Sequence, residues 1–150
     1  MDDTDRRLLR LLQKDGRMTN ADLARQAGLS PAATFERVRR LQKEGVIEGY
    51  TALLNPEKLE RGLLVFVEMV LDRTNPDVFD AFSKAVQRAP EILECHMVAG
   101  GFDYLLKARL RDMAAYRDFL GTTLAALPGV RQTHTYAVME EVKHTTGLPV

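Results

Sequence analysis

The chain has 150 residues, in which 21 Lys and Arg balance 21 Asp and Glu, and it has a single cysteine. The length excludes a large multidomain enzyme, and 45% hydrophobic with 28% charged residues excludes a disordered protein. One cysteine excludes a disulfide scaffold, and because no signal segment or membrane-length apolar run is present, we expect a soluble cytoplasmic protein with no membrane partner.

The first part of the chain, residues 1–48, has the apolar periodicity of three short helices. The first helix follows an acidic start and ends before Gly16, and the second fits Asn20 to Ala27 with Thr19 or Asn20 as its cap. A tight turn at Gly28 and Leu29 separates the second helix from the third. Two helices joined by a glycine-containing turn predict a helix-turn-helix.

The third helix begins with a strong capping signal. Ser30 is a good N-cap, and Pro31 falls at the first helical position, where its missing N–H costs nothing. The helix runs to about Glu44 and buries Thr34 or Phe35 together with Val38 and Leu41. After it, residues 46–50 resemble the short strand of a winged version, so residues 1–48 are expected to form a winged helix-turn-helix DNA-binding domain.

Although the net charge is zero, the stretch from Glu36 to Lys43 carries Arg37, Arg39, Arg40 and Lys43 against one glutamate. A local cationic patch of this kind is what a DNA-reading helix needs, because its arginines reach phosphates or a guanine edge. Small residues at the start of the helix would allow close approach to the major groove. A charge run alone is more often a solvated helix face, and that alternative stays open.

Residues 49–62 are expected to form a hinge strand and linker, and residues 63–150 alternate strand and helix patterns. Strands are expected at 63–71, 92–98, 104–110 and 130–142. One helix starts at Asn75 and Pro76, and another is capped by Asp112. The order βαββαβ predicts a ferredoxin-like sandwich, and the whole chain is therefore of the α+β class.

The first of these strands is apolar on both sides, with Leu64, Phe66 and Val70 on one side and Val65, Val67 and Met69 on the other. A ferredoxin-like sheet has helices on one face only, so the other face would have to be covered by another surface. A second copy of the chain is the simplest cover, and we therefore expect this domain to form dimers.

The hairpin turn contains Gly100 and Gly101, whose backbone N–H groups could bind the carboxylate of a small zwitterion. Asp103 could accept from its ammonium group, and Met113 with Val138 could line an apolar side-chain pocket. The alternative is that the glycines form only a hairpin turn and that Asp103 is its hydrogen-bonding partner.

No catalytic pattern is present, and we expect neither an enzyme nor a bound metal or cofactor. Cys95 and His96 are adjacent on a strand, so their side chains point to opposite faces and cannot form a dyad. There is no phosphate-binding glycine loop, and His134 and His144 lack the spacing of metal ligands. A small ferredoxin-like enzyme and an assembly module whose helix-turn-helix binds only protein remain as alternatives.

The chain resembles the Lrp/AsnC, or feast/famine, family of regulators, and is most similar to its leucine-responsive branch. The resemblance is carried by LLQKDGRMTNADLA (11–24), GLSPAATFERVRRLQKEGVIEGYTALLNP (28–56), ECHMVAGGFDYLLKARL (94–110) and LPGVRQTHTYAVMEEVKHT (127–145). It implies binding to double-stranded DNA, self-association into dimers and octamers, and a small amino acid, leucine or a similar one, as effector.

The resemblance also implies which residues act. DNA contacts fall on the helix that opens at Ser30, at Ser30, Ala32, Ala33, Thr34, Arg37, Arg39 and Arg40. The effector binds between dimers near the glycine-rich turn, at His96, Gly100, Gly101, Phe102, Asp103 and Tyr104, with Met113, Tyr136, Ala137 and Val138 as neighbours. Dimers would place two such helices in successive major grooves of a roughly palindromic site.

Overall fold

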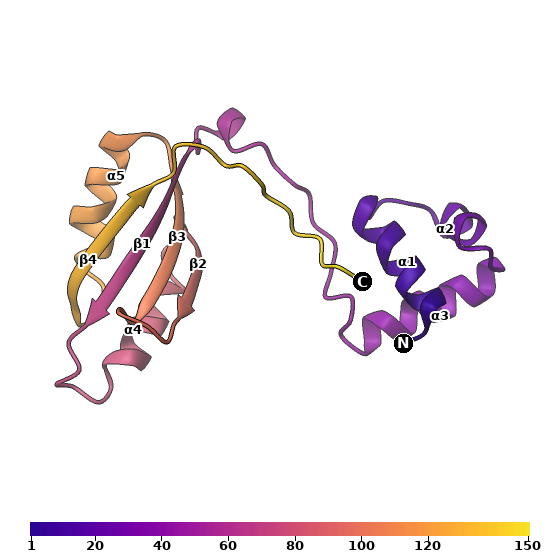
Figure 1. Ribbon diagram of the computed structural model, residues 1–150, viewed down its shortest axis with the longest axis horizontal. Coiled ribbons are helices and arrows are strands. Elements are labelled where there is room, and N and C mark those ends of the chain that lie inside the picture. The colour runs from indigo at the N-terminus through magenta and orange to yellow at the C-terminus, as the bar shows by residue number, and fades with distance from the viewer. The chain divides into compact units, whose positions relative to one another are not determined.

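The computed structural model describes all 150 residues and divides into two compact units (Figure 1). One unit comprises Met1–Leu53 together with Lys143–Val150, and the other comprises Leu54–Val142. The sequence led us to expect 63–150 as one domain, whereas the structure places the C-terminal residues 143–150 with the first unit. None of the helices combines the length and the apolar character needed to cross a membrane.

The first unit is a bundle of three helices: α1 (Asp3–Lys14), α2 (Asn20–Ala27) and α3 (Pro31–Lys43). Each helix has the side-chain N-cap that its sequence indicates: Asp2 forms a capping box with Asp5, Thr19 caps α2, and Ser30 caps α3. The caps satisfy backbone donors that would otherwise have no partner. Apolar side chains from all three helices, Leu8, Leu23 and Leu41 among them, are buried in this unit.

The turn between α2 and α3 depends on Gly28, which has a φ of 72° in the left-handed region. The N–H of Leu29 donates to the carbonyl oxygen of Ala24 at 3.0 Å, so the turn closes the C-terminal end of α2. The side-chain amide of Asn20 donates to the carbonyl oxygen of Pro31 at 2.9 Å and ties the two helices together. The expected helix-turn-helix is present.

The strand expected at residues 46–50 is not formed, and neither is the hinge strand expected in 49–62. The N–H groups of Val46 and Ile47 both donate to the carbonyl oxygen of Leu41, at 2.9 and 3.1 Å. These donors close the end of α3 and are not available to a strand ladder. Apart from a single 3₁₀ turn at Glu57–Leu59, the connector is irregular.

The C-terminal residues pack on α1. The Gln13 side chain makes two hydrogen bonds with the backbone of Leu148: its amide donates to the carbonyl oxygen at 3.0 Å, and its own oxygen accepts from the N–H at 2.6 Å. Arg10 donates to the terminal oxygen of Val150 at 2.8 Å. These contacts explain why the last residues belong to the first unit.

The second unit is a βαββαβ fold made of β1 (Leu63–Leu71), α4 (Val78–Val86), β2 (Ile92–Met97), β3 (Tyr104–Leu110), α5 (Met113–Phe119) and β4 (Val130–Ala137). A π-helical turn, Leu120–Leu124, continues α5. The strands lie in the order β2-β3-β1-β4, all neighbours are antiparallel, and both helices lie on one side of the sheet (Figure 1). The ferredoxin-like arrangement expected from the sequence is confirmed.

Two boundaries differ from the expectation by more than one residue. The first helix of this unit begins at Val78 rather than at Asn75, because the Asn75 side chain accepts from the N–H of Asp77 and forms a turn before the helix. The last strand ends at Ala137 rather than at residue 142. The ladder with β1 ends at the pair of Val65 and Ala137, and one further hydrogen bond, from the N–H of Val138 to the carbonyl oxygen of Leu64 at 2.9 Å, follows it.

The core of the second unit lies between the sheet and its two helices. Val65, Val67 and Met69 alternate along β1 on this side and are at most 1% exposed. Tyr104 stacks against Phe82 of α4 with ring centroids 4.6 Å apart.

The opposite face of the sheet is mixed rather than apolar throughout. Phe66, Val70 and Leu105 are half-buried there, and charged residues stand between them. Lys107 of β3 donates to Glu94 of β2 at 2.8 Å. β1 therefore has apolar side chains on both faces, as inferred from the sequence. On the open face, however, the apolar surface does not continue across the neighbouring strands.

Candidate functional sites

The first candidate site is the solvent-facing side of α3. Ser30, Ala32 and Ala33 at its start are exposed, as expected for a helix end that approaches a large partner. The Ser30 hydroxyl accepts from the N–H of Ala33 at 3.2 Å and is engaged in capping. This end of the helix therefore presents backbone and small side chains.

Thr34 does not belong to this surface, because its side chain is completely buried. Its hydroxyl donates to the carbonyl oxygen of Ser30 at 3.0 Å, so no group is left for a ligand. The sequence left open whether Thr34 or Phe35 points inward, and the structure shows that Thr34 does while Phe35 is 56% exposed. Thr34 lies seven residues before the buried Leu41, and that spacing repeats the same helix face.

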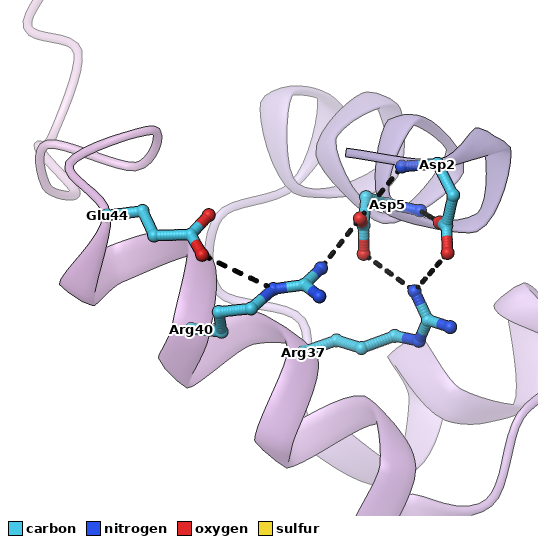
Figure 2. A network of polar contacts seen from close by, with 5 residues as sticks. All are labelled: Asp2, Asp5, Arg37, Arg40 and Glu44. Atoms are coloured by element: carbon cyan, nitrogen blue, oxygen red, sulfur yellow. Dashed lines mark hydrogen bonds and ion pairs between the residues drawn. The ribbon is translucent and has the colours of Figure 1, made fainter.

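Arg37 and Arg40 are bound to acidic residues at the start of α1 (Figure 2). One guanidinium nitrogen of Arg37, Nη1, donates to Asp2 and to Asp5, each at 2.8 Å. Nη2 of Arg40 donates to the second carboxylate oxygen of Asp5 at 2.6 Å. The Asp5 side chain is only 1% exposed, so this carboxylate depends on the two arginines for its charge partners.

The arrangement favours the ionised carboxylates. The hydrogen bond from Arg37, helped by the N–H of Asp5, lowers the pKa of Asp2 to about 2. Burial opposes ionisation of Asp5, yet the N–H of Asp2 and the guanidinium of Arg37 together hold the pKa of Asp5 below its usual value. The same contacts raise the pKa of Arg37. The cluster is therefore fully charged at neutral pH.

The second candidate site is an open pocket of about 530 Å³ beside the turn between β2 and β3. It brings together four of the residues expected at an effector site: Gly100, Gly101, Phe102 and Asp103. The end of β1, the residues that follow it and the start of β4 complete the lining, which adds Val70, Leu71, Asp72, Arg73, Thr74 and Arg131.

Asp103 is not a free acceptor in this pocket. Its side chain is 4% exposed, accepts from the N–H of Leu71 at 2.8 Å and pairs with Arg73. The hydrogen bond from Leu71, supported by Arg73, lowers the pKa of Asp103 despite its burial. The side chain of Asp103 is thus engaged within the chain, but its partners are the end of β1 and Arg73 rather than the glycine turn that the sequence offered as the alternative.

The remaining expected effector residues lie elsewhere in the protomer. Tyr104 is buried in the core, and His96 is exposed on β2, where it contacts Glu94 at 3.2 Å. Met113 is 58% exposed on α5. Of the residues at the end of β4, Tyr136 donates to Glu68 at 3.1 Å, Ala137 is exposed and Val138 is half-buried.

Sequence reasoning missed Arg73 and Arg131, the two cations of the pocket. Neither stands in a recognisable motif, and they are far apart along the chain. They meet because β1 pairs with β4 in a register that joins Val70 to Gln132. Its place two residues after the end of a predicted strand was the only available signal for Arg73.

Cys95 and His96 do not form a catalytic pair. Cys95 is half-buried against the core, where burial raises the pKa of its thiol, whereas His96 lies on the opposite face of the sheet. No group of three or more His, Cys, Asp or Glu side chains is placed to hold a metal ion.

A helix-turn-helix unit combined with a βαββαβ unit that carries a ligand-sized pocket defines a DNA-binding regulator with a sensory domain. A winged helix-turn-helix DNA-binding model matches residues 1–48, and the Lrp/AsnC ligand binding domain model matches residues 64–148. The chain belongs to the Lrp/AsnC family of transcriptional regulators.

Known relatives match along the full length. The leucine-responsive regulatory proteins of Escherichia coli K12 and Klebsiella pneumoniae are each 57% identical over 150 residues, which is 100% of this chain and 92% of theirs. A transcriptional regulator from Neisseria meningitidis, solved as a complex with L-methionine, has a TM-score of 0.95 at 37% identity, covering 99% of this chain and 96% of its own. An AsnC family regulator from Agrobacterium tumefaciens has a TM-score of 0.94 at 36% identity, covering 99% and 97%.

Proposed function

We propose that this protein regulates transcription in response to a small amino acid. In this proposal, cytoplasmic dimers bind roughly palindromic DNA through α3, and an amino acid alters their assembly or DNA affinity. The main support for the proposal is that one chain of this family combines a capped, exposed helix α3 with a pocket lined by cationic side chains. Coupling between two such sites is typically about 1–3 kcal/mol.

The DNA contacts are assigned to the exposed part of α3. Ser30, Ala32 and Ala33 approach the groove edge, and Arg39 supplies a cation for the backbone. Thr34 is excluded from this assignment by its burial. The sequence also suggested Arg37 and Arg40 as DNA contacts. Both are already ion-paired with aspartates at the start of α1 and are left out of this assignment.

The amino acid is assigned to the pocket at the β2–β3 turn. Arg131 makes no salt bridge in the chain, and it can bind the ligand carboxylate together with the N–H groups of Gly100 and Gly101. Phe102 and Val70 supply apolar contact, which favours an aliphatic ligand such as leucine. The L-methionine bound by the Neisseria relative is of the same chemical class.

The other candidate effector residues would complete the site from a second copy of the chain. His96, Met113, Tyr136, Ala137 and Val138 are half-buried or exposed in the protomer and do not line this pocket. Phe66 and Leu105, which are only half-buried on the open sheet face, suit a dimer contact there. Octamers would follow from further contacts between dimers.

The proposal is tested by calorimetry with a panel of amino acids, run beside mobility shift on duplex DNA and a measurement of particle mass. We expect binding of an aliphatic amino acid, a shift of DNA, and a mass or DNA affinity that changes with the ligand. A monomeric particle at micromolar concentration contradicts the dimer, and absence of any DNA shift contradicts the regulator.

A further inference from the structure

We infer that Asp2 and Asp5 hold Arg37 and Arg40 as internal partners and so limit the attraction of α3 for DNA of any sequence. The contact with the DNA backbone is then left to an exposed stripe of the same helix, defined here as Ala32, Glu36, Arg39 and Lys43. The inference rests on the proposed function, because it states which residues of α3 meet DNA and which do not.

The geometry makes the arginines costly to release. Asp5 is 1% exposed, and each of its carboxylate oxygens accepts from a different arginine, from Arg37 at 2.8 Å and from Arg40 at 2.6 Å. A phosphate that captured either guanidinium would leave a buried carboxylate with a missing partner. The pairs are therefore expected to persist when DNA binds.

The net charge around Arg37 and Arg40 also disfavours their contact with DNA. Asp2, Asp5 and Glu44 bring three negative charges to the two positive charges of Arg37 and Arg40, since Glu44 also lies 3.9 Å from Arg40. The sum is one net negative charge (2 − 3), which a DNA phosphate would not approach favourably. The cationic patch counted along the sequence is thus largely neutralised in three dimensions.

The exposed stripe has the opposite character. Its members are separated by four, three and four residues, which places them on one side of a helix, and all are exposed. Arg39 and Lys43 make no salt bridge with any residue of the chain, and Glu36 likewise has none. These two cations are free to replace counterions along a DNA backbone.

A double-variant comparison separates the two pairs of cations. The full chain is titrated with a random-sequence 30-base-pair duplex over a range of salt concentrations, and its thermal unfolding is measured alongside. We expect R39A/K43A to reduce the slope of log affinity against log salt by about 2 for each protomer engaged, with little change in Tm. R37A/R40A is expected to keep the wild-type slope while lowering Tm.

A second test asks whether Asp2 limits DNA binding by α3. It changes one charge only, so it stays informative even if the R37A/R40A variant does not fold. Asp2→Asn keeps a side-chain oxygen to cap α1 but releases part of the hold on Arg37, whereas Asp3→Asn makes the same charge change at an exposed residue with no ion pair. Arg37 keeps its bond to Asp5 in Asp2→Asn, so the slope is expected to stay close to that of the wild type. We expect Asp2→Asn to bind the random duplex more tightly than Asp3→Asn does, because it removes a negative charge directly beside α3.

Two results overturn the inference: a slope that falls as much in R37A/R40A as in R39A/K43A, or equal binding by Asp2→Asn and Asp3→Asn. Both leave the proposed function intact, because the wild-type chain still binds DNA. A wild-type chain that shows no salt-dependent DNA binding removes the proposed function and the inference together.

Discussion

The carboxylate of Asp103 accepts a hydrogen bond from the backbone N–H of Leu71 at 2.8 Å, which joins the start of β3 to the end of β1 beside the pocket. The N–H of Asp103 in turn donates to the carbonyl oxygen of Met69 at 2.9 Å. The glycine-rich turn is thereby fixed to the end of β1. The Asp103 carboxylate is therefore occupied, whereas Gly100, Gly101 and Arg131 also line the pocket.

Replacing Asp103 by asparagine is expected to destabilise the second unit. The variant loses the charge that pairs with Arg73, and a hydrogen bond to a buried charged group contributes about 1.5–3 kcal/mol. A fall in Tm of several degrees in thermal unfolding is the expected outcome. Asp118→Asn, at an exposed carboxylate without an ion pair, is the control, and equal melting of the two variants would contradict the structural role of Asp103.

Replacing Arg131 by alanine is expected to weaken amino-acid binding without affecting the fold. Loss of a charge-assisted hydrogen bond to a carboxylate corresponds to about 10-fold or more in affinity, measured by calorimetry. Arg88→Ala removes an equally unpaired arginine from an exposed position away from the pocket and serves as the matched control. If both variants bind the amino acid as the wild type does, the ligand carboxylate lies elsewhere.

Stability is expected to fall in acid in a way that depends on the cluster at the start of α1. The pKa of Asp2 is lowered to about 2 in the folded state, against about 4 for an unfolded aspartate. A lowered carboxyl pKa contributes stability that is complete above pH 4 and is lost as the pH falls towards 2. Thermal unfolding between pH 6 and pH 2 should therefore show a flatter pH dependence for Asp2→Asn. A variant curve parallel to that of the wild type would rule out this linkage.

Alanine at Gly28 is expected to strain the turn of the helix-turn-helix. A Cβ there would meet nothing within 4 Å, so the cost comes from the backbone alone, whose φ is 72°. A non-glycine residue in this region costs about 1 kcal/mol, which a denaturant titration resolves. Gly49→Ala, also in open space but without a positive φ, should be neutral. Similar losses at both positions would mean that conformation is not the cause.

Much of the fold could be read from local sequence signals. Ser30 followed by Pro31 marks the start of α3, and the periodicity of each segment gives the βαββαβ order, because these signals act within a few residues. The strand expected at residues 46–50 did not form, because the end of α3 and the absence of a pairing strand outweighed its local strand propensity. Its N–H groups were taken by the carbonyl oxygen of Leu41, and no neighbouring strand was present to pair with it.

The sites were less predictable than the fold, because they depend on contacts between distant residues. Counting charges along α3 could not show that Arg37 binds Asp5, 32 residues earlier in the chain. In the same way, only the pairing of β1 with β4 brings Arg131 to the glycine-rich turn. Residue types and spacing indicated candidate regions but not which side chains were already hydrogen-bonded or ion-paired within the chain.

The return of residues 143–150 to α1 means that the polypeptide passes between its two units twice. A protease that cuts the connector near Asn55 would therefore yield two fragments, and the larger would still carry the segment that pairs with Gln13. Under native conditions the nicked protein should elute from a sizing column as one species. Separation would require denaturant or a second cut between Ala137 and Lys143.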